Sequence, residues 1–354
     1  MVLILFELIA TAKPRGVHIM QTRRNALKVL GGIGVSCLAQ ADGAAEPVTA
    51  PKKLPKSEIE LMMKSLSNWG RWGKDDQLGA LNLITPRKRQ QAAALVKQGT
   101  AVSLAADVVP DRRGNETAPF VQRMMSVPKP GVEIAAASDE YRVQYHGFAL
   151  THIDALCHMC YKGEMYNGFS QREVTADGVM KLGVGQLKNG IFTRGVLMDV
   201  PRLLGVRFLE GAHAIYPEDL DAWENKSGMK VESGDAVLIR TGCWMRRRVG
   251  GEWDVMKGSA GLHASCLPWL KERDVAVVGS DLALDVLPSG VDGFELPVHW
   301  VSIVAMGMPI LDNCDLEKVS EQANELGRWT FLLTVAPWAV EGGTGSPVNP
   351  IATF

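Results

Sequence analysis

The chain has 354 residues, of which 46% are hydrophobic and 22% are charged, and its formal net charge is −1. This length allows one large domain or two small ones. The balanced charge gives no electrostatic reason to expect a nucleic acid or an anionic membrane as partner, and no apolar run of about eighteen residues predicts a spanning helix. We therefore expect a soluble protein with no nucleic-acid or membrane partner.

The N-terminus has the layout of a twin-arginine export signal. Arg23 and Arg24 are followed by Ala26-Leu27-Lys28, then by a mildly apolar, glycine-rich stretch and by small residues at Ala39 and Ala41. This order is typical of a cleavable targeting segment. We interpret residues 1–41 as the signal, with Met20 as a plausible true start, and expect a periplasmic or otherwise exported protein. The alternative is a basic N-terminal helix on an ordinary domain.

The remaining chain divides into an arm and one catalytic domain. Residues 42–56 are rich in Pro, Ala and Lys and indicate a linker or extended arm, which leaves residues 57–354 for the domain. Ser57 and the acids after it predict a short helix over 57–64. Thr85 and Pro86 predict the start of a second helix, and Gly99 its end.

Short apolar runs then alternate with amphipathic ones. The apolar runs predict strands over 101–109, 195–200, 236–241, 275–279 and 331–335. The other segments predict helices over 217–225, 264–272, 298–306 and 316–326. Such alternation favours an α/β domain with a mixed sheet. Residues 111–138, rich in Pro, Gly and charge, indicate a long surface excursion of the kind that often covers an active site.

His152, Asp154 and His158 form the constellation with the clearest chemistry. In an extended segment, residues two apart point to the same face, so His152 and Asp154 can hold one metal ion. His158 can turn back toward the same ion and act as a general base. An isolated pair of this kind is usually a surface or capping pair; His158, Thr151 and the upstream His146 favour the metal site.

Residues 151–158 resemble the metal-binding signature of the cyclase family, whose members include bacterial kynurenine formamidase-like and isatin hydrolase-like metal-dependent hydrolases. Further segments are similar to a longer branch of that family: 68–73, 76–82, 162–168, 194–200, 234–242 and 342–350. The resemblance implies a single α/β domain of the swivelling β/β/α type, with a barrel-like core of mixed sheet and flanking helices. It also implies a homodimer or homotetramer.

The family also takes metal ligands from its C-terminal half. His299 and Asp312 resemble that pair, although Asp312 stands where the family more often has glutamate. The alternative role of Asp312 is to cap the helix that follows. The family's first histidine falls on Phe148, which cannot bind a metal. His146 lies two residues earlier, on the same strand face as Phe148 if the segment is extended, and is either a substitute ligand or a structural histidine. The sequence therefore favours one divalent ion, zinc or manganese, held by His152, Asp154, His299 and Asp312, and gives a second ion little support.

The implied function is hydrolysis of the C–N bond of a small aryl-formamide or cyclic amide, with metal-bound water as the nucleophile and His158 as the general base. Phe148, His146 and Trp72 are the expected substrate pocket. Trp69, Phe294 and Trp300 are further candidates for its apolar walls, although tryptophans are more often core residues.

Two other functions remain open at this stage. Departures from the family pattern at Phe148 and Asp312 leave room for an exported, non-catalytic small-molecule or metal-binding protein on the same fold. Cys157 and Cys160 form a C-x-x-C pair that would suit a redox enzyme. A Ser-His-Asp hydrolase is disfavoured because the sequence has no G-x-S-x-G elbow.

Overall fold

The computed structural model describes residues 50–110 and 118–354, so the expected export signal lies outside the described residues. Residues 50–55, in the expected arm, are extended and attached to the domain. The backbone amide of Leu54 donates to the carbonyl of Gly290 at 3.1 Å, and His263 Nε2 lies 3.0 Å from the carbonyl oxygen of Lys52. This part of the arm is therefore held along its length.

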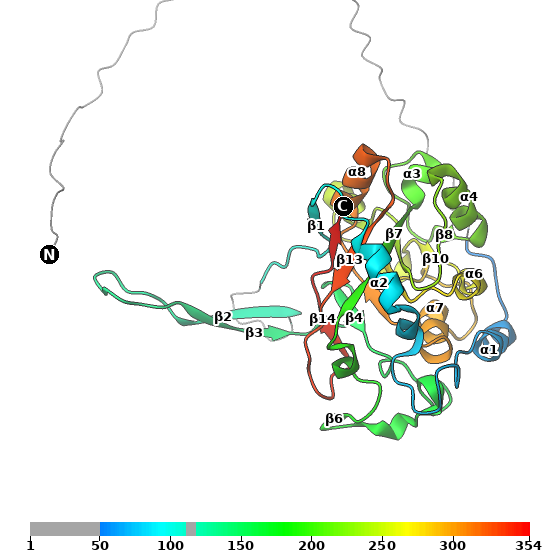
Figure 1. Ribbon diagram of the computed structural model, residues 1–354, viewed down its shortest axis with the longest axis horizontal. Coiled ribbons are helices and arrows are strands. Elements are labelled where there is room, and N and C mark those ends of the chain that lie inside the picture. The colour runs from blue at the N-terminus through cyan, green and yellow to red at the C-terminus, as the bar shows by residue number, and fades with distance from the viewer. Residues whose placement is uncertain (1–49, 111–117) are drawn as a thin grey trace, which may run out of the picture. The chain divides into compact units, whose positions relative to one another are not determined.

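A curled, nine-stranded mixed sheet forms the centre of the domain (Figure 1). In spatial order its strands are β1 (Ala101–Ser103), β15 (Ile351–Thr353), β13 (Thr330–Val335), β7 (Ile191–Asp199), β9 (Ala236–Arg240), β11 (Val277–Ser280), β12 (Ile310–Asp312), β4 (His152–Asp154) and β14 (Gly345–Pro347). The four strands from β7 to β12 are parallel, and strands at both sides join antiparallel. The single α/β domain with a barrel-like mixed sheet is confirmed.

Both faces of the parallel strands are buried, as is usual where helices cover such a sheet. On β9, Val237 and Ile239 pack into one apolar core while Leu238 packs into another. The first core includes residues of α4 (Pro217–Ser227), α6 (Leu267–Glu272) and α7 (Pro297–Trp300), and the second includes residues of α8 (Glu317–Leu326). Successive side chains of these strands therefore point into two different cores, one on each face of the sheet.

Several elements differ in length from the sequence prediction. Helix α1 spans Lys56–Ser65, close to its expected range. Thr85 Oγ1 accepts a hydrogen bond from the amide of Lys88 at 3.1 Å and starts α2, but α2 (Pro86–Ala93) ends well before Gly99. The strand expected over 101–109 is shorter and consists of β1 alone. β1 lies at the edge of the sheet, so it pairs only with β15, and this pairing sets its length. The expected helix over 298–306 is α7 followed by a π-helical turn, η7 (Val301–Ala305), a distortion frequent at functional sites.

Shorter elements complete the fold. They are α3 (Val200–Leu204), α5 (Cys243–Gly250), the strand pairs β5 (Val174–Thr175) with β6 (Gly178–Val179) and β8 (Ala214–Ile215) with β10 (Gly261–Leu262), and the 3₁₀ turns η1 (Gly79–Leu83), η2 (Tyr166–Gly168), η3 (Gln171–Glu173), η4 (Val184–Leu187), η5 (Val255–Lys257) and η6 (Ala264–Cys266). Over the described ranges, no helix is long and apolar enough to cross a membrane.

The expected surface excursion is a β-hairpin. Strands β2 (Phe120–Ser126) and β3 (Ser138–Val143) pair with each other and project away from the central sheet (Figure 1). Several apolar side chains along this hairpin, such as Met125 and Ile134, are exposed. The excursion therefore does not fold back over the domain, and only the base of the hairpin is placed to contribute to a site.

A buried ion cluster connects three elements at one end of the sheet. Arg240, the last residue of β9, donates from Nη1 to Asp199 at 2.8 Å and from Nη2 to Glu317 at 2.7 Å. Asp199 ends β7, and Glu317 begins α8. All three side chains are buried. Loss of the guanidinium would leave two carboxylates in the interior without their shared cation.

We predict that Arg240→Ala lowers the free energy of unfolding by about 3–5 kcal/mol, the usual effect of removing one partner of a buried ion pair. Urea denaturation of the full chain measures the change. Arg123→Ala is the matched control, because the Arg123–Glu140 pair is 67% and 51% exposed and should contribute within about 0.5 kcal/mol. Equal effects of the two substitutions would contradict a special role for the buried cluster.

Candidate metal centre

Strand β4 carries two of the expected ligands on one face. His152 and Asp154 are two residues apart on an extended segment, while Ile153 between them points into the opposite core. β4 pairs antiparallel with β12 in a register that sets His152 opposite Asp312. The sheet register therefore places residues 152 and 312, distant in sequence, on neighbouring strands.

His299 reaches the same place from helix α7. Its Nε2 atom lies 3.0 Å from Asp312 Oδ2, and its Nδ1 atom lies 2.6 Å from Asp285 Oδ2. Asp285 also accepts hydrogen bonds from the backbone amides of Val298 and His299, at 2.7 and 3.2 Å, at the start of this helix. One carboxylate thus fixes both the helix start and the orientation of the imidazole, leaving Nε2 toward the cluster.

His146 also belongs to the cluster. Its Nδ1 atom lies 3.0 Å from Asp154 Oδ1, and its Nε2 atom lies 2.9 Å from Thr344 Oγ1. The sequence prediction treated residues 146–148 as extended, but residues 146–149 form a turn in which Gly147 has φ +124°. The turn lets a histidine six residues before His152 reach the cluster, so the imidazole absent at Phe148 is supplied from His146.

The five side chains form two triads that share Asp154. The ligand atoms of His146, His152 and Asp154 lie within 4.8 Å of one another, as do those of Asp154, His299 and Asp312. His146 and Asp154 belong to the first triad, and Asp312 belongs to the second. Their atoms His146 Nδ1, Asp154 Oδ1 and Asp312 Oδ1 are buried, and apart from the 3.0 Å contact between the first two, none has a hydrogen-bond partner among the described residues. Because buried polar atoms without partners are costly, such atoms in each triad suit a cation. Imidazole and carboxylate ligands are appropriate for zinc or manganese.

Charge and burial act in opposite directions on Asp154. Burial opposes its ionisation, but the interaction with His146 and the charges of His158, His152 and His299 outweigh that effect and lower its pKa to about 2. For His299, burial disfavours the charged ring, yet Asp312 and Asp285 raise its pKa well above the ordinary value. A cation that takes Nε2 of His299 must therefore displace a proton, so its binding weakens as the pH falls.

His158, the expected general base, lies beside the triads. Its Nε2 atom lies 3.7 Å from Asp154 Oδ2, and its ring stacks on the His146 ring with centroids 3.9 Å apart and planes 10° apart. Burial lowers the pKa of His158 to about 4, although Asp154 opposes the shift. The imidazole is therefore neutral and able to accept a proton at neutral pH, and a quarter of the side chain is exposed.

Two expected pocket residues make structural contacts. The Phe148 ring packs against an apolar cluster that includes Cys243 and Leu282. The Trp72 ring lies under Arg71, whose guanidinium pairs with Asp274 at 2.6 Å. Asp274 precedes β11, whereas the triads lie where the neighbouring parallel strand β12 ends. Trp72 is thus at the opposite end of the strands, and its assignment to the pocket was wrong.

The other aromatic candidates are also structural. Trp69 Nε1 donates to the carbonyl of Val304 at 2.7 Å, and the rings of Phe294 and Trp300 form an edge-to-face pair 5.6 Å apart beside the first core. Cys157 is buried, and burial raises the pKa of its thiol to about 12. A thiolate at this position is therefore disfavoured, which counts against the redox interpretation.

Asp285 and Thr344 are the site residues that the sequence analysis missed. Asp285 follows β11 in a loop and belongs to no short motif, so its pairing with His299 depends on tertiary structure. Thr344 lies in the glycine-rich segment 342–350 that carried the family resemblance. That segment was a recognisable signal, but only the fold assigns its hydroxyl to His146.

We predict that Asp285→Asn weakens metal binding about 10–100-fold, because the amide can no longer hold His299 as the carboxylate does. Titration of the full chain with zinc, followed by calorimetry, measures the change. Asp281→Asn is the matched control: Asp281 is an equally buried aspartate that accepts hydrogen bonds from the amides of Thr241 and Gly242. If both variants lose the same affinity, the effect of Asp285 is general destabilisation.

Comparisons with known proteins identify relatives of this chain. Residues 87–285 match the family described as "Putative cyclase". A crystal structure described as a novel cyclase is 30% identical, with a TM-score of 0.74, and the match covers 82% of this chain and 99% of that one. Isatin hydrolase A from Labrenzia aggregata, bound to benzyl benzoate, is 20% identical with a TM-score of 0.51, and the match covers 74% and 94% of the two chains. No curated protein matches. The family match and the 30% identical structure establish that this chain belongs to the cyclase family.

Proposed function

We propose that the chain is a metal-dependent hydrolase that cleaves the C–N bond of a small aryl-formamide or cyclic amide. The observation that carries the proposal is a neutral histidine beside a cluster of five metal-ligating side chains. Isatin hydrolase A from Labrenzia aggregata, which shares the fold, is named for a cyclic amide, and this supports the substrate class. Its 20% identity shows similarity of fold alone, so the proposed chemistry rests on the side chains of this chain.

His146, His152, Asp154, His299 and Asp312 would hold the ions, with Asp154 between two positions. This replaces the expectation of a single ion, whose basis was the missing imidazole at Phe148. When bound, a divalent ion supplies Lewis-acid chemistry, polarising the scissile carbonyl and making water more acidic. Either zinc or manganese is compatible with the nitrogen and oxygen ligands.

The chain's own residues carry the proton. His158 Nε2 accepts a proton from the attacking water, and Asp154, 3.7 Å away, stabilises the imidazolium that results. The same nitrogen can then give the proton to the leaving amine, so that the base is regenerated. Thr344 and Asp285 hold His146 and His299 in place. These contacts keep the donor atoms oriented while His158 changes its protonation state.

The direct test is hydrolysis by the ion-loaded full chain of N-formylaniline and isatin, followed by absorbance. Turnover that disappears with a chelator and returns with zinc or manganese supports the proposal. No turnover of either compound by a chain shown to hold its ions would leave a non-catalytic binding protein as the better description.

We predict that His158→Ala retains its metal but loses about 100-fold or more in kcat, the usual contribution of a general base. His152→Ala should lose both metal and turnover. In the wild type kept saturated with metal, the acid limb of the kcat/KM profile should lie near pH 4, because His158 is neutral above its lowered pKa and becomes protonated below it. Near-wild-type turnover in His158→Ala would show that another group is the base.

A further inference from the structure

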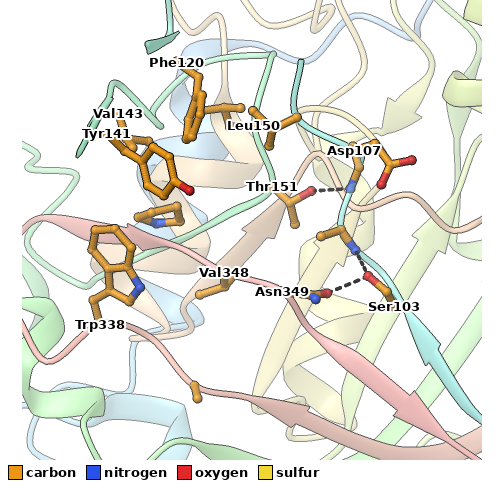
Figure 2. Close-up of a pocket in the computed structure, with 15 residues that line it drawn as sticks. Ser103, Asp107, Phe120, Tyr141, Val143, Leu150, Thr151, Trp338, Val348 and Asn349 are labelled. Carbon is orange, nitrogen blue, oxygen red and sulfur yellow. Dashed lines mark hydrogen bonds between the residues drawn. The ribbon is translucent and has the colours of Figure 1, made fainter. Parts of the chain in front are cut away.

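A groove runs along the base of the hairpin, beside the edge strand β14. It consists of two adjoining cavities of about 570 and 220 Å³, which share the side chains of Tyr141, Val143, Trp338 and Pro347. Figure 2 shows the larger cavity, with Phe120, Tyr141 and Val143 of the hairpin facing Trp338 of the C-terminal segment. Volumes of this size are typical of sites for small organic molecules.

Aromatic rings stand on both sides of the groove and remain open to solvent. Trp338 is 56% exposed and Tyr141 is 54% exposed. Phe120 packs against Tyr141, with ring centroids 5.2 Å apart and planes inclined by 39°. Large rings that line a hollow and are left exposed favour an apolar or aromatic occupant, because covering them removes their apolar surface from water.

The smaller cavity lies beside the metal centre. Tyr145 and Gly345 both line it. The Tyr145 ring lies 4.6 Å from the His146 ring and 6.1 Å from the His152 ring, measured between centroids. A Cβ at Gly345 would come within 3.1 Å of both His146 and Tyr145, so the absence of a side chain there permits this close approach. The groove is therefore separated from the candidate ligand His146 only by Tyr145 and Gly345.

The far end of the groove is polar. Ser103 Oγ donates to Asn349 Oδ1 at 2.6 Å, and the exposed Asp107 lies close by (Figure 2). A carboxylate at this end disfavours an anionic occupant. The groove as a whole therefore suits a molecule that is aromatic along its length and ends in a neutral or cationic group.

We propose that this groove binds a second aromatic ring of the amide substrate, held between Tyr141 and Trp338, and so selects two-ring over one-ring amides. The inference rests on the proposed hydrolase function for its substrate class. Residues of the hairpin base thereby become specificity determinants, although none of them belongs to the metal cluster.

The test compares N-formylaniline with N-formyl-4-benzylaniline, which carries a second ring. Trp338→Ala should lower kcat/KM for the two-ring compound, relative to the one-ring compound, about tenfold, equivalent to about 1.4 kcal/mol. Trp338→Phe should restore most of the preference, because a ring is again present. Met125→Ala is the control: Met125 is 57% exposed on the same hairpin but does not line the groove, so the preference should not change. A preference that is absent in the wild type, or unchanged in Trp338→Ala, would overturn the proposal.

A binding experiment distinguishes absence of hydrolase activity from absence of ring binding in the groove. If the wild type hydrolyses neither compound, binding of N-formyl-4-(4-fluorobenzyl)aniline is followed by fluorine NMR. Binding to the wild type and to Met125→Ala, with at least tenfold weaker binding to Trp338→Ala, would support the groove without catalysis. No binding to the wild type, or equal binding to all three proteins, would contradict it.

Discussion

The carboxylate of Asp154 is the constraint on which the rest of the site depends. Asp154 is the last residue of the three-residue strand β4, is almost fully buried, and is shared by both triads of candidate ligands. A buried carboxylate remains ionised only where positive charge or hydrogen bonds compensate for lost hydration. The surrounding histidines supply that compensation, and their arrangement also creates a binding environment for divalent cations.

The fold explains why these residues meet. Antiparallel pairing sets His152 opposite Asp312 and Asp154 opposite Gly345. Strand β12 therefore contributes a ligand, while the missing side chain of Gly345 on β14 leaves room for His146. Helix α7 begins next to the sheet because Asp285 accepts its first amides, and the same carboxylate orients His299. Register and helix capping thus assemble the site from parts of the chain more than 150 residues apart.

Much of this could be predicted from the sequence, and the remainder shows where local patterns stop. Continuous apolar runs predicted strands β7, β9, β11 and β13, since a strand that is buried on both faces, such as β9, is apolar at nearly every position. The spacing of His152 and Asp154 placed them correctly on one face. The part played by His146 was left open between a substitute ligand and a structural histidine, because a turn, rather than an extended strand, precedes β4. No periodic pattern encodes that turn.

Other gaps have the same origin. Trp72 was assigned to the pocket by residue type, but it lies at the wrong end of the strands. Asp285 was overlooked because its partner His299 is fourteen residues away along an irregular loop. Both errors concern tertiary position, which depends on the folding of the whole domain, whereas the ligand pair on β4 needed only the two-residue period of a strand.

The number of ions bound per chain tests the central claim most directly. Mass spectrometry of the metal-loaded full chain should find two ions in the wild type, one in His146→Ala and none in Asp154→Ala, because Asp154 belongs to both triads and His146 to one. One ion in the wild type, unaffected by His146→Ala, would contradict the shared-carboxylate account and restore the single-ion site expected from the sequence.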